Sequence, residues 1–194
     1  MKNVVVFDFD GTITTKDSFV ELIRYVYGTK LMLFGFFHFA HLLLLMKLRM
    51  YPNYKVKQKV FSFFFKGMEQ DKFNAHCHNF AKDKSALLRP AAVKALQKAK
   101  TSGAEVLVVS ASVDNWVQCF LPDVKVLGTQ IEVEDGSLTG RFLTKNCYGQ
   151  EKVNRLLELY PDRREYHLTA YGDSRGDKEM LAFADESYYK PFRE

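Results

Sequence analysis

The stretch Val4–Thr12, which reads VVVFDFDGT, decides how the rest of the chain is interpreted. Its three Val residues and a Phe are typical of a short buried strand, and Asp8 and Asp10 follow with one residue between them. In an extended chain these carboxylates lie on the same side, roughly 6–7 Å apart. Like charges are costly to bury unless a metal ion or a reaction uses them. Gly11 then frees the backbone to approach a ligand. We therefore predict a functional site here, the alternative being an ordinary polar turn.

The length and composition set the broad class of the protein. A chain of 194 residues can hold one good-sized domain, or a smaller core with an inserted lid. An apolar content of 47% and an aromatic content of 14% suffice for a packed interior and exclude a disordered chain. The three Cys residues lack a Cys-x-x-Cys spacing, so we expect core thiols in a reducing compartment. The N-terminal apolar run is too short for a secretory signal, and we expect a cytoplasmic protein.

Residues 15–88 show helical patterns and no strand pattern. Asp17 or Ser18 can cap a helix that ends at Gly28, because Asp and Ser favour helix starts and Gly favours helix ends. Two more helical stretches are predicted over about 55–66 and 71–84, separated by a glycine. We therefore expect an all-helical block, residues 15–88, inserted after the first strand.

This block contains an apolar run, Leu31–Met46, that has no Lys, Arg, Asp or Glu. A bilayer span needs roughly twenty apolar residues, so the run is short for a transmembrane helix. Two interpretations remain: a buried helix of the block, or a helix lying in a membrane surface. Between Lys47 and Lys72, seven basic residues face two acidic ones, an excess that equals the net charge of +5. An anionic surface or substrate is therefore expected to meet this part of the chain.

From Arg89 onward, strands and helices alternate. Helices are predicted from Pro90 to Gly103 and over 114–120, 150–160 and up to 183, and strands over 106–109, 124–126, 129–134, 137–142, 166–171 and 188–189. Such alternation is typical of an α/β fold with a parallel sheet. We assign residues 1–14 and 89–194 to this core. Ligands bind at the carboxyl ends of such strands, which brings Asp8 and Asp10 together with Ser110 and the acidic loop around Asp173.

These polar clusters resemble the motifs of the haloacid dehalogenase superfamily. Asp8-Phe9-Asp10-Gly11-Thr12 resembles its first motif, Asp-x-Asp-Gly-Thr, and Ser110, Lys152 and Gly172-Asp173-(x)3-Asp177 follow in the family's order. The resemblance covers nearly all of the chain outside residues 15–88. It implies a Rossmannoid parallel-sheet core with an inserted all-helical cap of the C1 type.

The resemblance also implies a role for each motif residue. Asp8 would be a nucleophile that forms an aspartyl-phosphate, and Asp10 a general acid and base. Ser110 and the backbone at Ala111 would hold phosphate oxygens, while Lys152 would neutralise developing charge. These roles agree with the needs of phosphoryl transfer, in which a weak carboxylate nucleophile attacks an anion.

A metal ion is implied by the same motifs. Mg²⁺ is a hard cation that favours oxygen ligands and binds phosphate. By resemblance, Asp8 and Asp173 would contribute carboxylates, Asp10 its backbone carbonyl, and Asp177 would support the metal or its waters. We therefore expect a Mg²⁺-dependent phosphomonoesterase.

The segment after the first motif bears on the substrate. A helical lid at this place resembles the subfamily of the phosphoserine phosphatases, whose specificity Glu is replaced here by Asp17. A closer resemblance is to the phosphatidylglycerophosphatase C group, which shares this Asp, Arg24-Tyr25, the apolar run, and the stretches 149–153 (GQEKV) and 171–174 (YGDS). It implies a lipid or membrane-associated phosphate and peripheral attachment at the inner face of the cytoplasmic membrane.

Two rival functions remain open at this point. One is a soluble phosphatase of a small metabolite such as phosphoserine or a sugar phosphate, and the other is a catalytically silent phosphate-binding or membrane-tethering module. Nucleic acid is not expected as a partner, because the aromatic residues among the lysines of 55–66 have the spacing of a packed helix face. The sequence indicates no particular oligomeric state.

Overall fold

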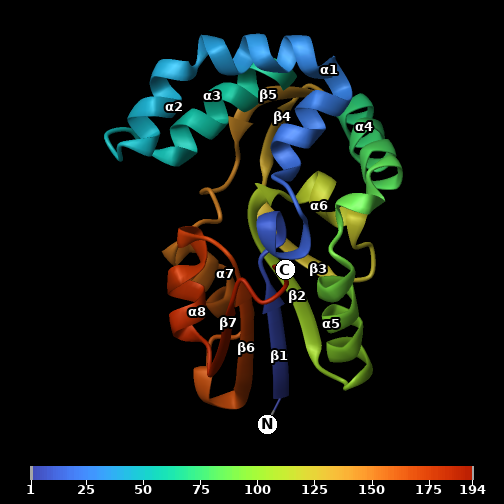
Figure 1. Ribbon diagram of the computed structural model, residues 1–194, viewed down its shortest axis with the longest axis vertical. Coiled ribbons are helices and arrows are strands. Elements are labelled where there is room, and N and C mark those ends of the chain that lie inside the picture. Colours follow the sequence, from blue (N-terminus) through green and yellow to red (C-terminus); the bar gives the residue numbers. More distant parts are fainter. Residues whose placement is uncertain (1, 194) are drawn as a thin grey trace.

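The computed structural model describes residues 2–193 and shows an α/β core beneath an arch of helices (Figure 1). Five parallel strands form the main sheet in the order β3-β2-β1-β6-β7. Their bounds are β1 (Lys2–Phe7), β2 (Glu105–Val113), β3 (Lys125–Thr129), β6 (Tyr166–Gly172) and β7 (Glu186–Tyr189). The predicted fold class, an α/β protein with a parallel sheet, is confirmed.

Helices cover both faces of this sheet, as the apolar strands require. Successive side chains of a strand point to opposite faces, so Val4 and Val6 of β1 pack with α7 (Gln150–Leu159) and α8 (Lys178–Phe183). Phe7 belongs to the other core, which includes residues of α5 (Pro90–Thr101). A further short helix, α6 (Asp114–Phe120), follows β2. A strand buried on both sides reads as a continuous apolar run, which explains the sequence of β1.

The arch consists of α1 (Ser18–His38), α2 (Ala40–Lys47), α3 (Asn53–Phe65) and α4 (Gln70–Asp83) and spans the carboxyl ends of the strands (Figure 1). The helix end predicted at Gly28 is a kink instead: Gly28 has a φ of +76° and α1 continues beyond it. The apolar run is divided at Phe39, and α1 and α2 are bent by 64° relative to each other. Among residues 2–193, no single helix is long and apolar enough to cross a bilayer.

A β-hairpin joins the helical arch from a distant part of the chain. Its strands β4 (Ile131–Glu134) and β5 (Ser137–Phe142) are antiparallel around the predicted Asp135-Gly136 turn. The hairpin lies outside the main sheet and packs on α3, with the rings of Phe61 and Phe142 5.4 Å apart. We assigned this hairpin to the core from the sequence. In the structure, the packing of these rings holds it against the helices of the predicted cap. The division into two domains stays a prediction.

Candidate active site

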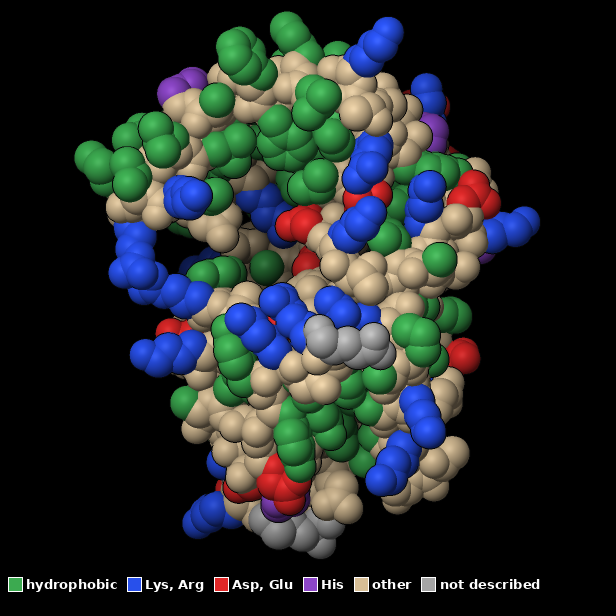
Figure 2. All heavy atoms as spheres, in the orientation of Figure 1, with side chains coloured by type: hydrophobic (Ala, Val, Ile, Leu, Met, Phe, Trp, Pro, Cys, Tyr) green, Lys and Arg blue, Asp and Glu red, His purple; other side chains and the backbone are tan. Residues whose placement is uncertain are grey.

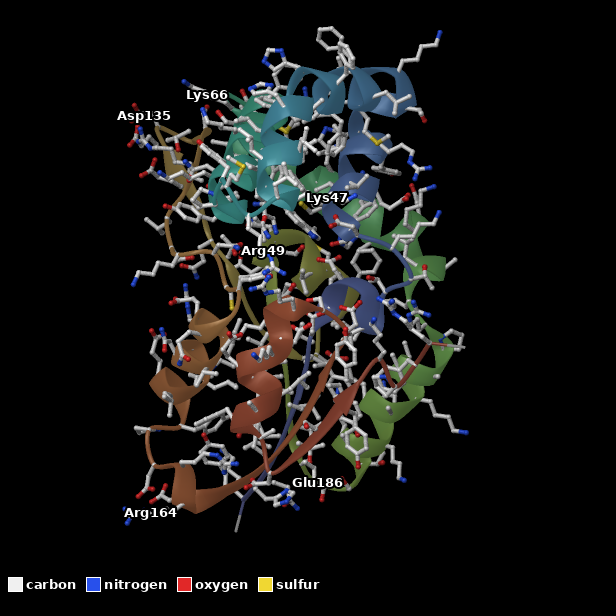
Figure 3. All side chains as sticks on the ribbon, turned by 60° about the vertical axis from the view of Figure 1, so that its left-hand side comes forward. Lys47, Arg49, Lys66, Asp135, Arg164 and Glu186 are labelled. Atoms are coloured by element: carbon white, nitrogen blue, oxygen red, sulfur yellow. The ribbon has the colours of Figure 1, made fainter. Side chains whose placement is uncertain are left out.

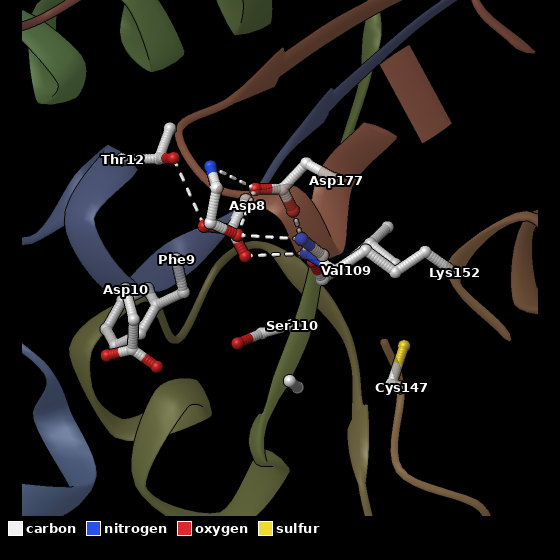
Figure 4. Close-up of polar contacts among 12 residues, drawn as sticks. Asp8, Phe9, Asp10, Thr12, Val109, Ser110, Cys147, Lys152 and Asp177 are labelled. Carbon is white, nitrogen blue, oxygen red and sulfur yellow. Dashed lines mark hydrogen bonds and ion pairs between the residues drawn. The ribbon is translucent and has the colours of Figure 1, made fainter. Parts of the chain in front are cut away.

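The nucleophile candidate lies where β1 ends. Asp8 follows directly after Phe7, and its backbone N–H donates to the carbonyl of Tyr171, 2.8 Å away on β6. Its side chain is only 8% exposed. One carboxylate oxygen accepts from the Nζ of Lys152 at 2.6 Å and the other from the hydroxyl of Thr12 at 3.1 Å (Figure 4). Asp8 is thus a buried carboxylate in a fixed orientation.

Lys152 connects three segments at the carboxyl ends of the strands: the end of β1, strand β2 and the loop after β6. Its Nζ donates to Asp8 at 2.6 Å, to Asp177 at 2.6 Å and to the carbonyl of Val109 at 2.7 Å (Figure 4). The side chain is 2% exposed, and an ammonium at such depth is tolerated only when its donors are paired. All three donors have acceptors here, so this lysine is held in one position.

The buried charges shift one another's protonation. Burial raises the pKa of Asp8 to about 7, although Lys152 acts to lower it. Burial acts to lower the pKa of Lys152, but Asp8 and Asp177 together raise it above its usual range. Asp177 has a lowered pKa, because Lys152 and hydrogen bonds from Ser174 outweigh the effect of its burial. Lys152 is therefore an ammonium at neutral pH, and Asp8 titrates near neutrality.

The acidic loop after β6 is shaped by Asp177. One oxygen of this carboxylate accepts from the backbone N–H groups of Asp173 and Ser174, at 3.1 and 2.9 Å, and from the hydroxyl of Ser174 at 2.9 Å. The other oxygen accepts from Lys152. Since both oxygens are engaged, Asp177 positions the loop and the lysine.

The carboxylates form a place that suits a cation. Ligand atoms of Asp8, Asp173 and Asp177 all lie within 4.8 Å of one another. Among residues 2–193, Oδ1 of Asp173 is buried without a hydrogen-bond partner, and such an atom is costly unless a ligand satisfies it. Oxygen-only donors around a small gap fit a hard cation such as Mg²⁺. Three of the four residues predicted to hold the metal, Asp8, Asp173 and Asp177, thus lie together. The part of Asp10, and the binding of the metal itself, stay predictions.

Gly11 is required by this geometry. Its φ is +79°, a conformation that L-residues rarely adopt, and a Cβ here would collide with the carboxylate of Asp173. The glycine of the first motif therefore allows the turn after β1 to pass directly beside the acidic loop.

Asp10 lies apart from the Lys152 cluster. One of its carboxylate oxygens accepts from the backbone N–H of Ser18 at 2.7 Å, and the other accepts from the hydroxyl of Ser112. These contacts direct the side chain toward the start of α1, while it still lines the same pocket as Asp8. Its predicted proton-transfer role therefore stays a proposal.

A cavity of about 520 Å³ separates the core from the helical arch. Ser110 and Ala111 of β2 line it from below, and Ser110 is buried with its hydroxyl oxygen accepting from the backbone of Ser112 at 3.0 Å. The structure thus places the predicted phosphate-holding residues in the pocket of Asp8. It leaves their contacts with phosphate as a prediction.

The arch contributes charged and apolar groups to the same pocket. Asp17 caps α1 through a 3.0 Å hydrogen bond from the backbone of Val20 and also lines the cavity. Lys57 of α3 reaches across and donates to the carbonyl of Ala111 at 2.7 Å, and burial lowers the pKa of this ammonium. The rest of this side is largely apolar, with lining residues Phe19, Val20, Phe36, Leu43, Met46, Val56 and Val60.

Several residues of the site were missed by sequence reasoning. Ser112 and Thr12 have local signals, since both stand in the polar motifs that follow the strands. Lys57 and Arg193 have no local sequence signal. Arg193 pairs with Asp173 because the neighbouring Phe192 stacks on Tyr171, with ring centroids 5.5 Å apart. This stacking returns the end of the chain to the carboxyl ends of the strands. Such contacts depend on tertiary packing alone.

Comparisons with known proteins agree with this geometry. The model of the haloacid dehalogenase-like hydrolase family matches residues 5–182. Protein CicA of Caulobacter vibrioides is 36% identical over 201 residues, which cover 98% of this chain and 86% of the relative.

Solved structures share the fold. A Bordetella pertussis Tohama I protein of unknown function has a TM-score of 0.83 at 16% identity, with 96% of this chain and 89% of that chain covered. A phosphoserine phosphohydrolase-like protein from Francisella tularensis has a TM-score of 0.69 at 17% identity, with coverages of 96% and 86%. The family match confirms the expectation that the protein is an enzyme. The chain belongs to the haloacid dehalogenase-like hydrolase family.

Proposed function

We propose that the protein is a Mg²⁺-dependent phosphomonoesterase that acts through an aspartyl-phosphate on Asp8. The observation that carries this proposal is a buried carboxylate held by Lys152 at 2.6 Å on the wall of a cavity that Ser110 and Asp173 also line. Neutral metabolites would not need a paired ammonium and a cation site at one point. A phosphate monoester needs both, because it carries negative charge into the site.

In the proposed reaction, a carboxylate oxygen of Asp8 attacks phosphorus and the bond to the leaving alcohol breaks. Asp10 gives the alcohol oxygen a proton. In the second half, Asp10 takes a proton from water, the water oxygen attacks phosphorus, and the bond to Asp8 breaks to release phosphate. Thr12 and Lys152 hold the carboxylate of Asp8 in place during both steps.

Asp8, Asp173 and the backbone at Asp10 would hold Mg²⁺, with Asp177 in support. When bound, the ion supplies positive charge that offsets the repulsion between the carboxylate and the phosphate. Lys152 contributes a permanent positive charge of its own, 2.6 Å from Asp8. Mg²⁺ binding itself is measurable by calorimetry, and we expect Asp173→Asn to weaken it.

The test of the activity is Mg²⁺-dependent release of phosphate from a water-soluble aryl phosphate. We expect Asp8→Asn to lose at least about 10⁴-fold in rate, as nucleophile removal does in other hydrolases. Asp123→Asn is the matched control, because Asp123 is exposed outside the pocket. Full activity of Asp8→Asn would overturn the proposal.

We further propose a lipid or membrane-associated phosphomonoester as the substrate, with the enzyme at the inner face of the cytoplasmic membrane. The apolar arch side of the pocket supports this, since Phe36, Leu43 and Met46 offer no polar group to a small metabolite. The resemblance to the phosphatidylglycerophosphatase C group also supports it.

A substrate panel separates this proposal from its soluble rival. Phosphatidylglycerophosphate and phosphatidic acid in mixed micelles are compared with phosphoserine and sugar phosphates, all with Mg²⁺. We expect the largest kcat/KM for a lipid. A larger value for phosphoserine or a sugar phosphate would favour the soluble phosphatase, and no turnover of any substrate would favour a silent binding module.

A further inference from the structure

The outer side of α1 and α2 exposes large apolar side chains. Phe37 is 81% exposed, and every residue of α2 is at least partly exposed. Six apolar residues in and just after these helices are each 58% exposed or more: Leu33, Phe34, Phe37, Leu44, Leu48 and Met50. We call these six residues the cap apolar surface. Figure 2 shows apolar side chains gathered over the arch and continuing to the edge of the hollow beneath it. Exposed apolar patches of this kind mark interaction sites.

The charged residues of the chain segment that forms this surface are all basic. From Leu22 to Met68 the chain has eight Lys and Arg residues and no Asp or Glu. Of these, Lys30, Lys47 and Arg49 are exposed in and beside α1 and α2, and Lys47 and Arg49 lie near each other at the end of α2 (Figure 3). A second copy of the same surface would bring cation against cation, which is unfavourable. An anionic partner with an apolar interior is complementary to both features.

The same helices also form the pocket wall. On α1, Phe36 lines the cavity while its neighbour Phe37 points to solvent, and on α2 Leu43 lines the cavity while Leu44 is exposed. One face of each helix therefore lines the cavity, and another face is exposed to solvent. A surface that binds a lipid bilayer through the free face keeps the substrate supply next to the pocket.

We propose that the cap apolar surface inserts into the headgroup region of an anionic bilayer, while Lys30, Lys47 and Arg49 contact lipid phosphates. The inference rests on the proposed function in taking the substrate to be held in a membrane. Apolar burial and attraction to anionic lipid act together at such interfacial helices.

The experiment is flotation of the full chain with vesicles of phosphatidylcholine alone or mixed with phosphatidylglycerol. We expect binding to the mixed vesicles, weakened by high salt because exposed charges are screened. The double variant Leu33→Ser/Phe37→Ser should bind at least about tenfold more weakly, since two apolar side chains no longer enter the bilayer. Circular dichroism of each variant checks that it is folded.

The matched control is Leu143→Ser/Tyr189→Ser, which removes one Leu and one aromatic residue that are 65% and 58% exposed outside α1 and α2. It should bind like the unaltered chain. No binding to mixed vesicles, or equal loss in both double variants, would overturn the inference. So would a dimer in sedimentation experiments that only Leu33→Ser/Phe37→Ser dissociates, because the surface would then contact a second copy.

Flotation of Asp8→Asn separates the inference from the proposed activity. This variant should bind vesicles fully while it releases no phosphate. If it floats but the unaltered chain hydrolyses no phosphomonoester, the activity is wrong and the surface stands. If the unaltered chain hydrolyses aryl phosphate but does not float, the surface is wrong and the phosphatase stands.

Discussion

The sheet edge and the outer side of the arch depart from ordinary protein surfaces in opposite ways. At the sheet edge, Asp8, Lys152 and Asp177 are charged yet almost completely buried. On the arch, Phe37 and Met50 are apolar yet 81% and 71% exposed. A buried charge costs stability unless it is paired, and a large exposed apolar patch is typical of an interaction site. Each departure therefore marks a place where a partner is expected: a phosphate and a cation at one, a bilayer at the other.

The largest change is expected when the buried cluster loses its cation. Lys152→Met leaves Asp8 and Asp177 unpaired, so unfolding free energy should fall by about 3–5 kcal/mol, as for other broken buried pairs. Phosphate release should fall with it. Urea unfolding and the aryl phosphate assay measure both, with the exposed Lys178→Met as control. Unchanged stability would mean that the cluster is not held together by charge.

A second test uses the pH dependence of stability without metal. The pKa of Asp8 is raised from 3.8 to about 7. Its contribution to the stability of the fold is therefore fully present below about pH 4 and is lost as the pH rises through about 7. Asp8→Asn cannot titrate, so its stability relative to the unaltered chain should increase between about pH 5 and about pH 8, by roughly 2–3 kcal/mol. Urea unfolding with chelator at both pH values measures this, and a difference that does not vary with pH would contradict it.

A smaller effect is expected where an exposed residue reaches the buried cluster. Arg193 is 43% exposed and pairs with Asp173, so it competes with a cation for that carboxylate. Arg193→Gln should therefore strengthen Mg²⁺ binding, by up to about fivefold, because a partly exposed pair contributes at most about 1 kcal/mol. Calorimetry measures the affinity. Arg164→Gln, which breaks a remote exposed pair with Asp162, should leave it unchanged.

The smallest effect is expected at the exposed side of the arch. Phe37→Ala should change unfolding free energy by no more than about 0.5 kcal/mol, because its ring contributes little to the folded core. Phe61→Ala, at a residue that is fully buried in the same arch, should cost about 3–5 kcal/mol. Thermal or urea unfolding compares the two. Equal losses would show that Phe37 serves folding and would remove the contrast between the two regions.

Much of the fold could be predicted from local patterns. Apolar runs identified β1, β2 and β6, and the Asp135-Gly136 turn identified the hairpin between β4 and β5. The rule that ligands bind at the carboxyl ends of parallel strands brought Asp8, Ser110 and Asp173 to one place, where the structure has them. These features follow from periodicity and turn chemistry, which neighbouring residues determine.

Other features required long-range packing. The hairpin packs on α3 through the contact between the rings of Phe142 and Phe61. No local sequence pattern predicts which apolar face a pair of strands will cover. Lys57 enters the site only because the arch folds over β2.

By itself the sequence determined which residues are candidates for the site: a strand followed by Asp8 and Asp10, with a serine, a lysine and an acidic loop in order. Tertiary structure alone decided the contact of Lys152 with Asp8 across 144 residues, and which side of Leu31–Met46 is covered. The physical reason is that hydrophobicity is a property of a residue, whereas burial is a property of its neighbours. A run of apolar residues reads alike in a core and on a membrane, and only the folded chain shows that Phe36 lines the pocket while Phe37 is exposed.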